Sequence, residues 1–151
     1  GLSMPAATAG AAAVAFEGKL WVLGGYRVTR LGELVPTTAV MTYDPVANVW
    51  RASGDGLADP PSALPEARHS AAAAVLDGKL YLLGGAGAGG GLPGTVLVLD
   101  RTVQPPFWRP VANLPTPRAL LAAAVFGGRI WAIGGRGADG QASTTVEVYQ
   151  P

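Results

Sequence analysis

The sequence predicts an all-β fold made of three repeated antiparallel units, arranged as the blades of a propeller. An eight-residue pattern, in which an apolar strand closes in Gly-Gly, ends at Gly25, Gly85 and Gly135. An alanine-rich run and an X-Gly pair precede the strand in each copy, and a β-rich segment follows it after a variable loop. Self-similarity at a period of about 50 residues is typical of repeat folds, because a single unit cannot bury its apolar face alone.

Each repeat is predicted to open at a Met-Pro or Leu-Pro pair and to begin with a hairpin. These pairs divide a single repeat region, 1–151, into blades of about 4–60, 61–113 and 114–151. The first strands are the alanine-rich runs 11–16, 71–76 and 121–126. The turns that follow them are the X-Gly pairs 17–18, 77–78 and 127–128. An X-Gly pair between apolar runs predicts a two-residue hairpin, because a type I′ turn needs positive φ.

The rest of each repeat predicts a third strand and, in two repeats, a fourth. The third strands are 39–45, 95–101 and 145–151. Trp50 and Trp108 mark a fourth strand in the first two repeats, and the third repeat contains no such residue. We therefore expect three four-stranded antiparallel blades, of which the last is incomplete, and no helix longer than one turn.

The alanine-rich runs are predicted to be strands although alanine is the best helix former. They are short and are bounded by turn glycines on one side. In a propeller the inner strands converge on the central axis, where small side chains fit. The large residues Trp21, Tyr81 and Trp131 lie on the second strand, where neighbouring blades diverge and volume must be filled.

This pattern resembles the kelch repeat over nearly the whole chain. The residues that carry the resemblance are Gly24-Gly25, Tyr43, Asp44 and Trp50, then Gly84-Gly85, Leu99, Asp100 and Trp108, then Gly134-Gly135 and Tyr149. Leu99 replaces the tyrosine of the family pattern, and Gln150 replaces its aspartate. The resemblance implies a propeller of five to seven blades, most often six.

Three blades cannot close a propeller, which typically needs 4 to 8. They would leave two apolar blade faces exposed. Two solutions remain open: a homodimer in which two copies form a six-bladed ring with C2 symmetry, or blades supplied by the remainder of a longer propeller. We expect the dimer, with the first blade of each chain against the third blade of its partner.

Composition excludes several kinds of partner and chemistry. The net charge is +1 and basic residues are scattered, so neither nucleic acid nor a membrane surface is expected as a partner. There is no cysteine, which rules out disulfides and thiolate metal sites. Histidine and carboxylate residues do not cluster, so neither a metal nor a cofactor is expected. The abundance of alanine, glycine and proline is typical of high-GC bacterial genomes.

The chain offers few groups for catalysis. His69 is the single histidine, with Ser70 beside it and two carboxylates, Asp59 and Glu66, nearby in the sequence. Neighbouring residues on a strand point to opposite faces, so we expect no triad and no catalytic residue. The glycine-rich segment 84–94 precedes no helix, so it is predicted to be a flexible connecting loop and not a phosphate-binding loop.

Two arginines occupy one repeat position, before the inner strand. Arg68 and Arg118 each precede the first glycine of Gly-Gly by 16 residues, and Thr8 stands there in the first repeat. The kelch resemblance implies that such an arginine lies near the channel mouth and contacts ligands. Around a closed ring, four guanidinium groups would then favour an anionic partner, an acidic peptide or an anionic sugar. The alternative is a structural arginine that bonds backbone carbonyls of the neighbouring blade.

The candidate ligand-binding residues share the loop face with these arginines. The full set is Arg68, Arg118, His69, Tyr26, Arg27 and Arg136. We expect a non-enzymatic interaction module that binds its ligand on this face near the channel mouth. The alternative function is half of a carbohydrate-active or sugar-isomerising propeller, similar to a sialate mutarotase. A copper radical oxidase is excluded, since it needs several histidines and a cysteine crosslink.

Overall fold

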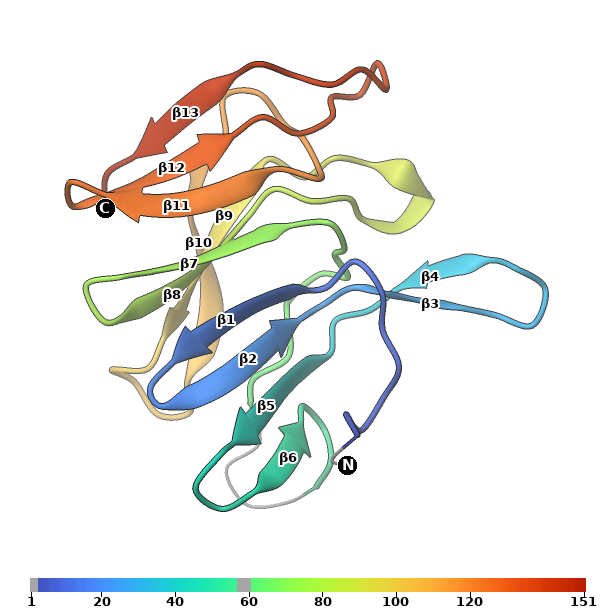
Figure 1. The fold of residues 1–151 in the computed structure, drawn as a ribbon, viewed down its shortest axis with the longest axis vertical. Helices are drawn as coiled ribbons and strands as arrows, with labels where there is room; N and C mark the ends of the chain where they lie inside the picture. The colour runs from blue at the N-terminus through green and yellow to red at the C-terminus, as the bar shows by residue number, and fades with distance from the viewer. Residues whose placement is uncertain (1–2, 57–60) are drawn as a thin grey trace.

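A computed structural model describes residues 3–56 and 61–151 as three larger antiparallel sheets and a separate two-stranded hairpin (Figure 1). The all-β prediction is confirmed. The first two sheets have four strands and the third has three, so the third blade lacks an outer strand in the part of the chain described. The helical content of the described residues is one short 3-10 turn, Ala88–Gly90.

Strand order within each sheet follows the chain outward from the first strand. The first sheet contains β1 (Ala12–Phe16), β2 (Lys19–Leu23), β5 (Val40–Asp44) and β6 (Val49–Ala52). The second contains β7 (Ala72–Leu76), β8 (Lys79–Leu83), β9 (Thr95–Asp100) and β10 (Phe107–Asn113). The third contains β11 (Ala122–Phe126), β12 (Arg129–Ile133) and β13 (Val146–Tyr149). We refer to these sheets as blades 1, 2 and 3.

The inner hairpin of every blade has the predicted two-residue turn. Glu17 and Gly18 have φ values of 48° and 71°, and the corresponding pairs in blades 2 and 3 are also positive at both positions. Positive φ at both central residues defines the type I′ turn, whose twist matches that of the flanking strands. The strands pair in the same register in all three hairpins, so corresponding residues of the blades are directly comparable.

The blades pack face to face, with their alanine-rich first strands side by side. Strand β7 contacts both β1 and β11, as Figure 1 shows. One buried apolar cluster lies between blades 1 and 2 and another between blades 2 and 3. Small residues on the first strands let neighbouring backbones approach, and bulkier residues such as Trp21 and Tyr81 fill the wider space behind them.

The Gly-Gly pairs of blades 1 and 2 bring the backbones of neighbouring blades into close contact. A Cβ on Gly24 would lie 2.1 Å from the carbonyl oxygen of Arg68, which belongs to the next blade. The N–H of Gly25 donates to that same carbonyl at 2.8 Å. Gly85 and Arg118 repeat the hydrogen bond between blades 2 and 3 at 3.0 Å. The glycines are therefore required by this backbone-to-backbone approach.

A separate hairpin projects from the loop face of blade 1. It consists of β3 (Tyr26–Val28) and β4 (Leu34–Pro36), and it extends well beyond the blades in Figure 1. Its turn carries Leu31, which is 87% exposed. Within residues 3–56 and 61–151, no helix is long and apolar enough to cross a membrane.

Packing between blades predicts a large effect for Leu82, which is fully buried in the cluster between blades 1 and 2. Leu82→Ala should lower the free energy of unfolding by about 2–5 kcal/mol, because it leaves a cavity in a closely packed site. Leu31→Ala, the matched control on the exposed turn, should change it by less than about 0.5 kcal/mol. Urea denaturation at one protein concentration measures both. Equal effects of the two variants would contradict this account of the core.

Candidate ligand-binding site on the loop face

The loop face is built on one backbone arrangement repeated in three blades. The residue after each Gly-Gly pairs with the residue three positions before the start of the first strand. These pairs are Ala9 with Tyr26, His69 with Ala86, and Ala119 with Arg136. The backbone pairing is constant while the larger side chain of each pair changes from tyrosine to histidine to arginine, so the three blades present different chemistry on this face.

Gly10, Ser70 and Leu120 occupy the following position in blades 1, 2 and 3. Backbone hydrogen bonds between these three residues link the blades. The N–H of Ser70 donates to the carbonyl of Gly10 at 2.6 Å, and the N–H of Leu120 donates to the carbonyl of Ser70 at 2.8 Å. All three residues have positive φ, with values of 62°, 53° and 57° in chain order. The left-handed backbone is costly for serine and leucine, and these contacts between blades hold it in place.

The structure corrects the prediction that His69 and Ser70 point to opposite faces. The Nδ1 atom of His69 and the hydroxyl of Ser70 lie 3.0 Å apart, within hydrogen-bonding distance. The alternation expected of a strand fails here because Ser70 has positive φ and neither residue lies in a regular strand. The rings of Tyr26 and His69 pack edge to face, with their centroids 5.2 Å apart.

The His69–Ser70 pair has no carboxylate to complete a triad among the residues described. The carboxylate of Glu66 instead faces the guanidinium of Arg68 at 3.7 Å, and Asp59 lies outside the described residues. Burial lowers the pKa of His69 below 6.5, so the imidazole is mainly neutral at neutral pH. The described residues contain no group of three potential metal-ligating side chains.

A pocket of about 420 Å³ lies between blades 2 and 3 on this face. His69 and Ser70 line it from blade 2, and Leu120 and Arg136 line it from blade 3. Much of the remaining lining consists of small residues: Ala86, Gly90, Gly91, Ala119, Gly137, Ala138 and Gly140. A pocket with few side chains and a small number of polar groups allows close approach of a ligand and fixes its orientation.

Arg136 supplies the positive charge of this pocket. Its Nε donates to the carbonyl of Gly140 at 2.6 Å, which anchors the side chain while it stays exposed. No carboxylate lines the pocket within the described chain. The free edge of the guanidinium and one donor of the His69–Ser70 pair, either the Nε2–H of His69 or the hydroxyl of Ser70, can therefore donate to an acceptor-rich group such as a carboxylate.

Arg68 and Arg118 do not share this pocket. Their side chains are 1% and 0% exposed, respectively. One Nη of Arg68 donates to the carbonyls of Gly84 and Thr95 at 3.2 and 2.8 Å. Burial lowers the pKa of Arg68, and the charge of Glu66 opposes this change. These contacts favour the structural role over direct ligand binding, with one correction: the accepting carbonyls belong to the arginine's own blade and not to its neighbour.

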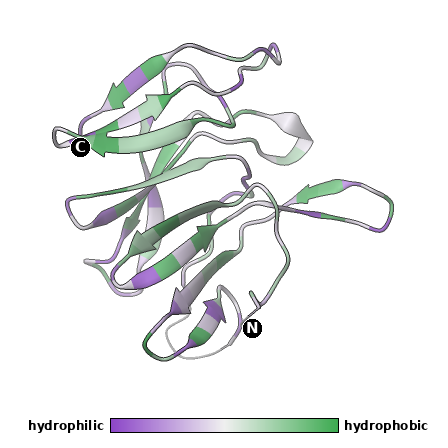
Figure 2. Cartoon of the chain, viewed as in Figure 1, coloured by the Kyte–Doolittle hydropathy of each residue, from purple (hydrophilic) through white to green (hydrophobic). Residues whose placement is uncertain are grey.

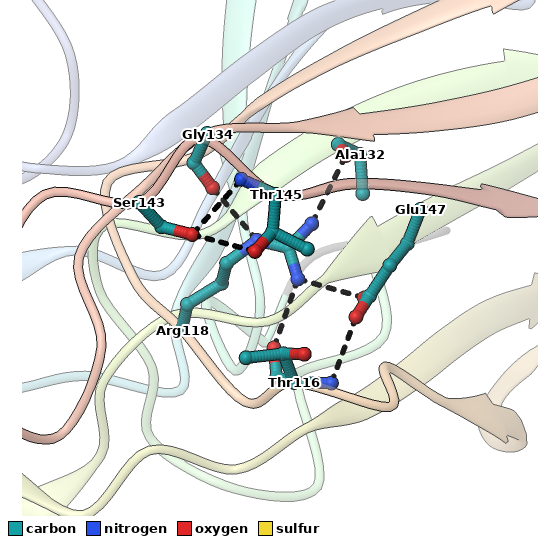
Figure 3. A network of polar contacts seen from close by, with 7 residues as sticks. All are labelled: Thr116, Arg118, Ala132, Gly134, Ser143, Thr145 and Glu147. Atoms are coloured by element: carbon teal, nitrogen blue, oxygen red, sulfur yellow. Dashed lines mark hydrogen bonds and ion pairs between the residues drawn. The ribbon is translucent and has the colours of Figure 1, made fainter.

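Arg118 forms the denser of the two networks (Figure 3). It donates to three backbone carbonyls, those of Thr116, Ala132 and Gly134, at 2.7–3.0 Å. It also forms an ion pair with Glu147 at 2.7 Å, and the second carboxylate oxygen of Glu147 accepts from the N–H of Thr116 at 2.9 Å. Thr8 makes one contact of this kind in blade 1, since its hydroxyl donates to the carbonyl of Gly24 at 3.1 Å.

Glu147 was not predicted from the sequence. The sequence feature that pointed to it is a charged residue between two valines in strand β13, where an apolar strand would have an apolar side chain. Of the other predicted site residues, Tyr26 lies beside the pocket through its contact with His69. Arg27 is exposed on β3 and lines a different hollow with Thr8. The structure thus brings His69 and Arg136 into one pocket, whereas Tyr26 contacts His69 but lines the other hollow with Arg27.

Comparison with known proteins identifies the family. The Kelch motif profile matches residues 7–55 and 117–151, more than half of the chain. The chain belongs to the kelch-motif family. This kelch chain is 37% identical over 93 residues to human Kelch-like protein 33, an alignment that spans 62% of the chain and 15% of that relative. It is 39% identical over 77 residues to mouse Kelch-like protein 35, covering 51% of the chain and 11% of the relative.

A solved structure extends the comparison to the fold. The protein titled YjhT matches 94% of this kelch chain and 51% of its own chain, with a TM-score of 0.74 and 18% sequence identity. The kelch chain thus superposes on about half of that structure, and it spans only a small part of the curated relatives. These sequence relatives are human and mouse proteins, and a bacterial origin stays a prediction.

The buried network predicts a large loss of stability for Arg118→Met. Removing the guanidinium of Arg118 leaves Glu147 as an uncompensated, mostly buried charge. The free energy of unfolding should therefore fall by about 3–5 kcal/mol. The double variant Arg118→Met/Glu147→Leu should regain part of this loss, because the unpaired charge is then gone. Urea denaturation of the three proteins checks the order. A double variant less stable than Arg118→Met would contradict a charge-based origin.

The pKa of His69 predicts a small dependence of stability on pH. The folded state lowers this pKa, so the unfolded state binds more protons, and stability should fall as pH drops below about 6.5. Because His69 is the single histidine, its imidazole proton resonances can be followed by NMR without assignment. We expect a midpoint below 6.5, and His69→Gln should lose less stability than wild type between about pH 7.5 and 5. A midpoint above 6.5 would contradict the effect of burial.

Proposed function

We propose that this kelch chain is a non-enzymatic interaction module whose pocket between blades 2 and 3 binds the acidic part of a protein partner. The observation that carries the proposal is the grouping of His69, Ser70 and Arg136 around one pocket on the loop face. We further propose that two copies close a six-bladed ring with C2 symmetry, which places two such pockets around one channel.

The polar groups of the pocket favour an anion with several acceptor oxygens. Arg136 has one Nε contact, to Gly140, and its remaining N–H groups can form a two-point contact with a carboxylate. The hydrogen-bonded pair of neutral His69 and Ser70 adds one weaker donor. The surrounding glycines let a peptide backbone approach closely. An aspartate or glutamate side chain on an extended segment fits this combination.

A second candidate depends on the contact between His69 and Ser70. A hydroxyl and an imidazole 3.0 Å apart in a pocket can exchange a proton with a bound ligand. This arrangement supports an anionic sugar as substrate, in a sugar-isomerising propeller. The interaction module is preferred because the described residues supply no third group that orients His69.

Arg136→Gln should weaken binding of an acidic peptide by about tenfold to 150-fold, the range expected for loss of a charge-assisted contact. Isothermal titration with a synthetic peptide rich in aspartate and glutamate measures the affinity. Arg30→Gln removes the same charge from the exposed β3–β4 turn, so it should leave the affinity nearly unchanged. Equal losses in both variants would show that binding depends on net charge and not on the pocket.

The same titration with a carboxylated monosaccharide distinguishes the second candidate. NMR of the anomeric protons would detect isomerisation of a bound sugar. Isomerisation that is abolished in His69→Ala would show that the protein is an enzyme and would contradict the proposal of an interaction module. The expected result is no change in the isomerisation rate when the protein is added.

A further inference from the structure

We propose that blade 3 receives blade 1 of a second copy through the same residue-by-residue contacts that join blades 1, 2 and 3 within the chain. In this arrangement Gly134 and Gly135 lie against Thr8 of the second copy, and Leu120 accepts a hydrogen bond from its Gly10. The inference deepens the C2 closure in the proposed function, on which it rests, by specifying which groups meet. Four observations support it.

The first observation is an exposed apolar face on blade 3. Phe126 is 75% exposed, whereas Leu76 and Phe16 at the same repeat position are each 5% exposed. Ile133 and Val146 are 42% and 50% exposed, respectively. Their counterparts in blades 1 and 2 are at most 1% exposed. Figure 2 shows the apolar end of β11 and the apolar positions of β13 on this outermost sheet. This face has the chemistry of a blade interface without a covering blade.

The second observation is the complementary face on blade 1. Leu20 is 51% exposed, whereas Leu80 and Ile130 at the same repeat position are fully buried against the preceding blade. Met4 is also exposed, while Leu64 and Leu114, which begin the other repeats, are buried. Blade 1 therefore carries the surface that inserts, and blade 3 carries the surface that receives.

The third observation is that two hydrogen-bond series between blades stop at these faces. In the first series Ser70 donates to Gly10 and Leu120 donates to Ser70, which leaves the N–H of Gly10 and the carbonyl of Leu120 without partners in the described chain. In the second, the N–H of Gly135 and the carbonyl of Thr8 are likewise unpaired, although the equivalent groups of the inner junctions are bonded. Each unpaired donor matches an unpaired acceptor on the opposite face.

The fourth observation is the empty space at Gly134. A Cβ on Gly24 or Gly84 would lie 2.1 or 2.5 Å from a carbonyl of the next blade. A Cβ on Gly134 would meet only the Ser143 carbonyl, at 3.4 Å, among the described residues. Gly134 nevertheless has φ of 61°, the same left-handed geometry as its counterparts. The position is shaped for a neighbouring backbone that the single chain does not provide.

The occupant we infer is a second copy of this chain. Both halves of the interface are present on it, and each repeats contacts that already join blades 1, 2 and 3. Two sets of three blades make six, which lies within the range that closes a propeller. The superposition on half of a solved chain is consistent with a three-blade unit that covers half of the ring. Blades from a longer chain are the competing occupant.

The test compares Gly134→Ala with Gly127→Ala by light scattering across a dilution series. Wild type should have twice the chain mass of 15.3 kDa. Gly134→Ala should raise the dimer dissociation constant by about a hundredfold or more, because it overpacks two identical contacts per dimer. Gly127→Ala is the matched control, since Gly127 has φ of 60° and nothing within 4 Å of its Cβ position. Gly127→Ala introduces the same strain of an alanine at positive φ, and this variant should remain dimeric.

A second pair of variants removes backbone strain from the test. Leu20→Glu places a charge on the inserting face and should dissociate the dimer, whereas Leu31→Glu on the projecting hairpin should not. A monomeric wild type would overturn both the C2 closure and this inference, and would leave longer-chain blades as the occupant. A dimer that survives both Gly134→Ala and Leu20→Glu would overturn this inference alone. Peptide affinity is measured in a separate titration, so a protein that fails to bind the peptide leaves the test of the dimer unaffected.

Discussion

The structure depends on one backbone contact between blades, in which the second glycine of a Gly-Gly pair, Gly25 or Gly85, donates its N–H to a carbonyl of the next blade. This contact brings two main chains so close that no side chain fits at the first glycine. It fixes the spacing of the blades near the axis, and the apolar clusters behind it fill the wider part of the wedge. The repeat is therefore defined by where two backbones touch as much as by its apolar pattern.

The buried arginines take part in this contact. The carbonyl of Arg68 accepts from the preceding blade, while its guanidinium bonds carbonyls of its own blade. Arg118 does the same with the help of Glu147. Each arginine thus couples the junction between two blades to the interior of one. The buried guanidinium of Arg118 is stable because its donors are largely satisfied by fixed carbonyls and Glu147, whereas the buried Nε of Arg68 has no hydrogen-bond partner among the described residues.

The constant frame leaves a few side chains free to vary. Tyr26, Ala86 and Arg136 occupy one backbone position, and their differences determine what each part of the loop face can contact. His69 and Ser70 meet because contacts between blades hold Ser70 in the left-handed region. Backbone strain at this position creates the polar pair in the pocket between blades 2 and 3, which links the packing of the blades to the chemistry of the loop face.

The sequence alone determined the blades, since hairpin turns, strand pattern and Gly-Gly positions depend on residues close together in the chain. The X-Gly pairs required positive φ, and repetition distinguished alanine-rich strands from helices. Tertiary structure decided the roles of Arg68 and Arg118, because identical residues can face a channel or enter a blade, and only the surrounding carbonyls select between these positions. It also decided the His69–Ser70 contact and the partnership of Arg118 with Glu147, 29 residues away. These depend on contacts between distant segments, which local periodicity does not encode.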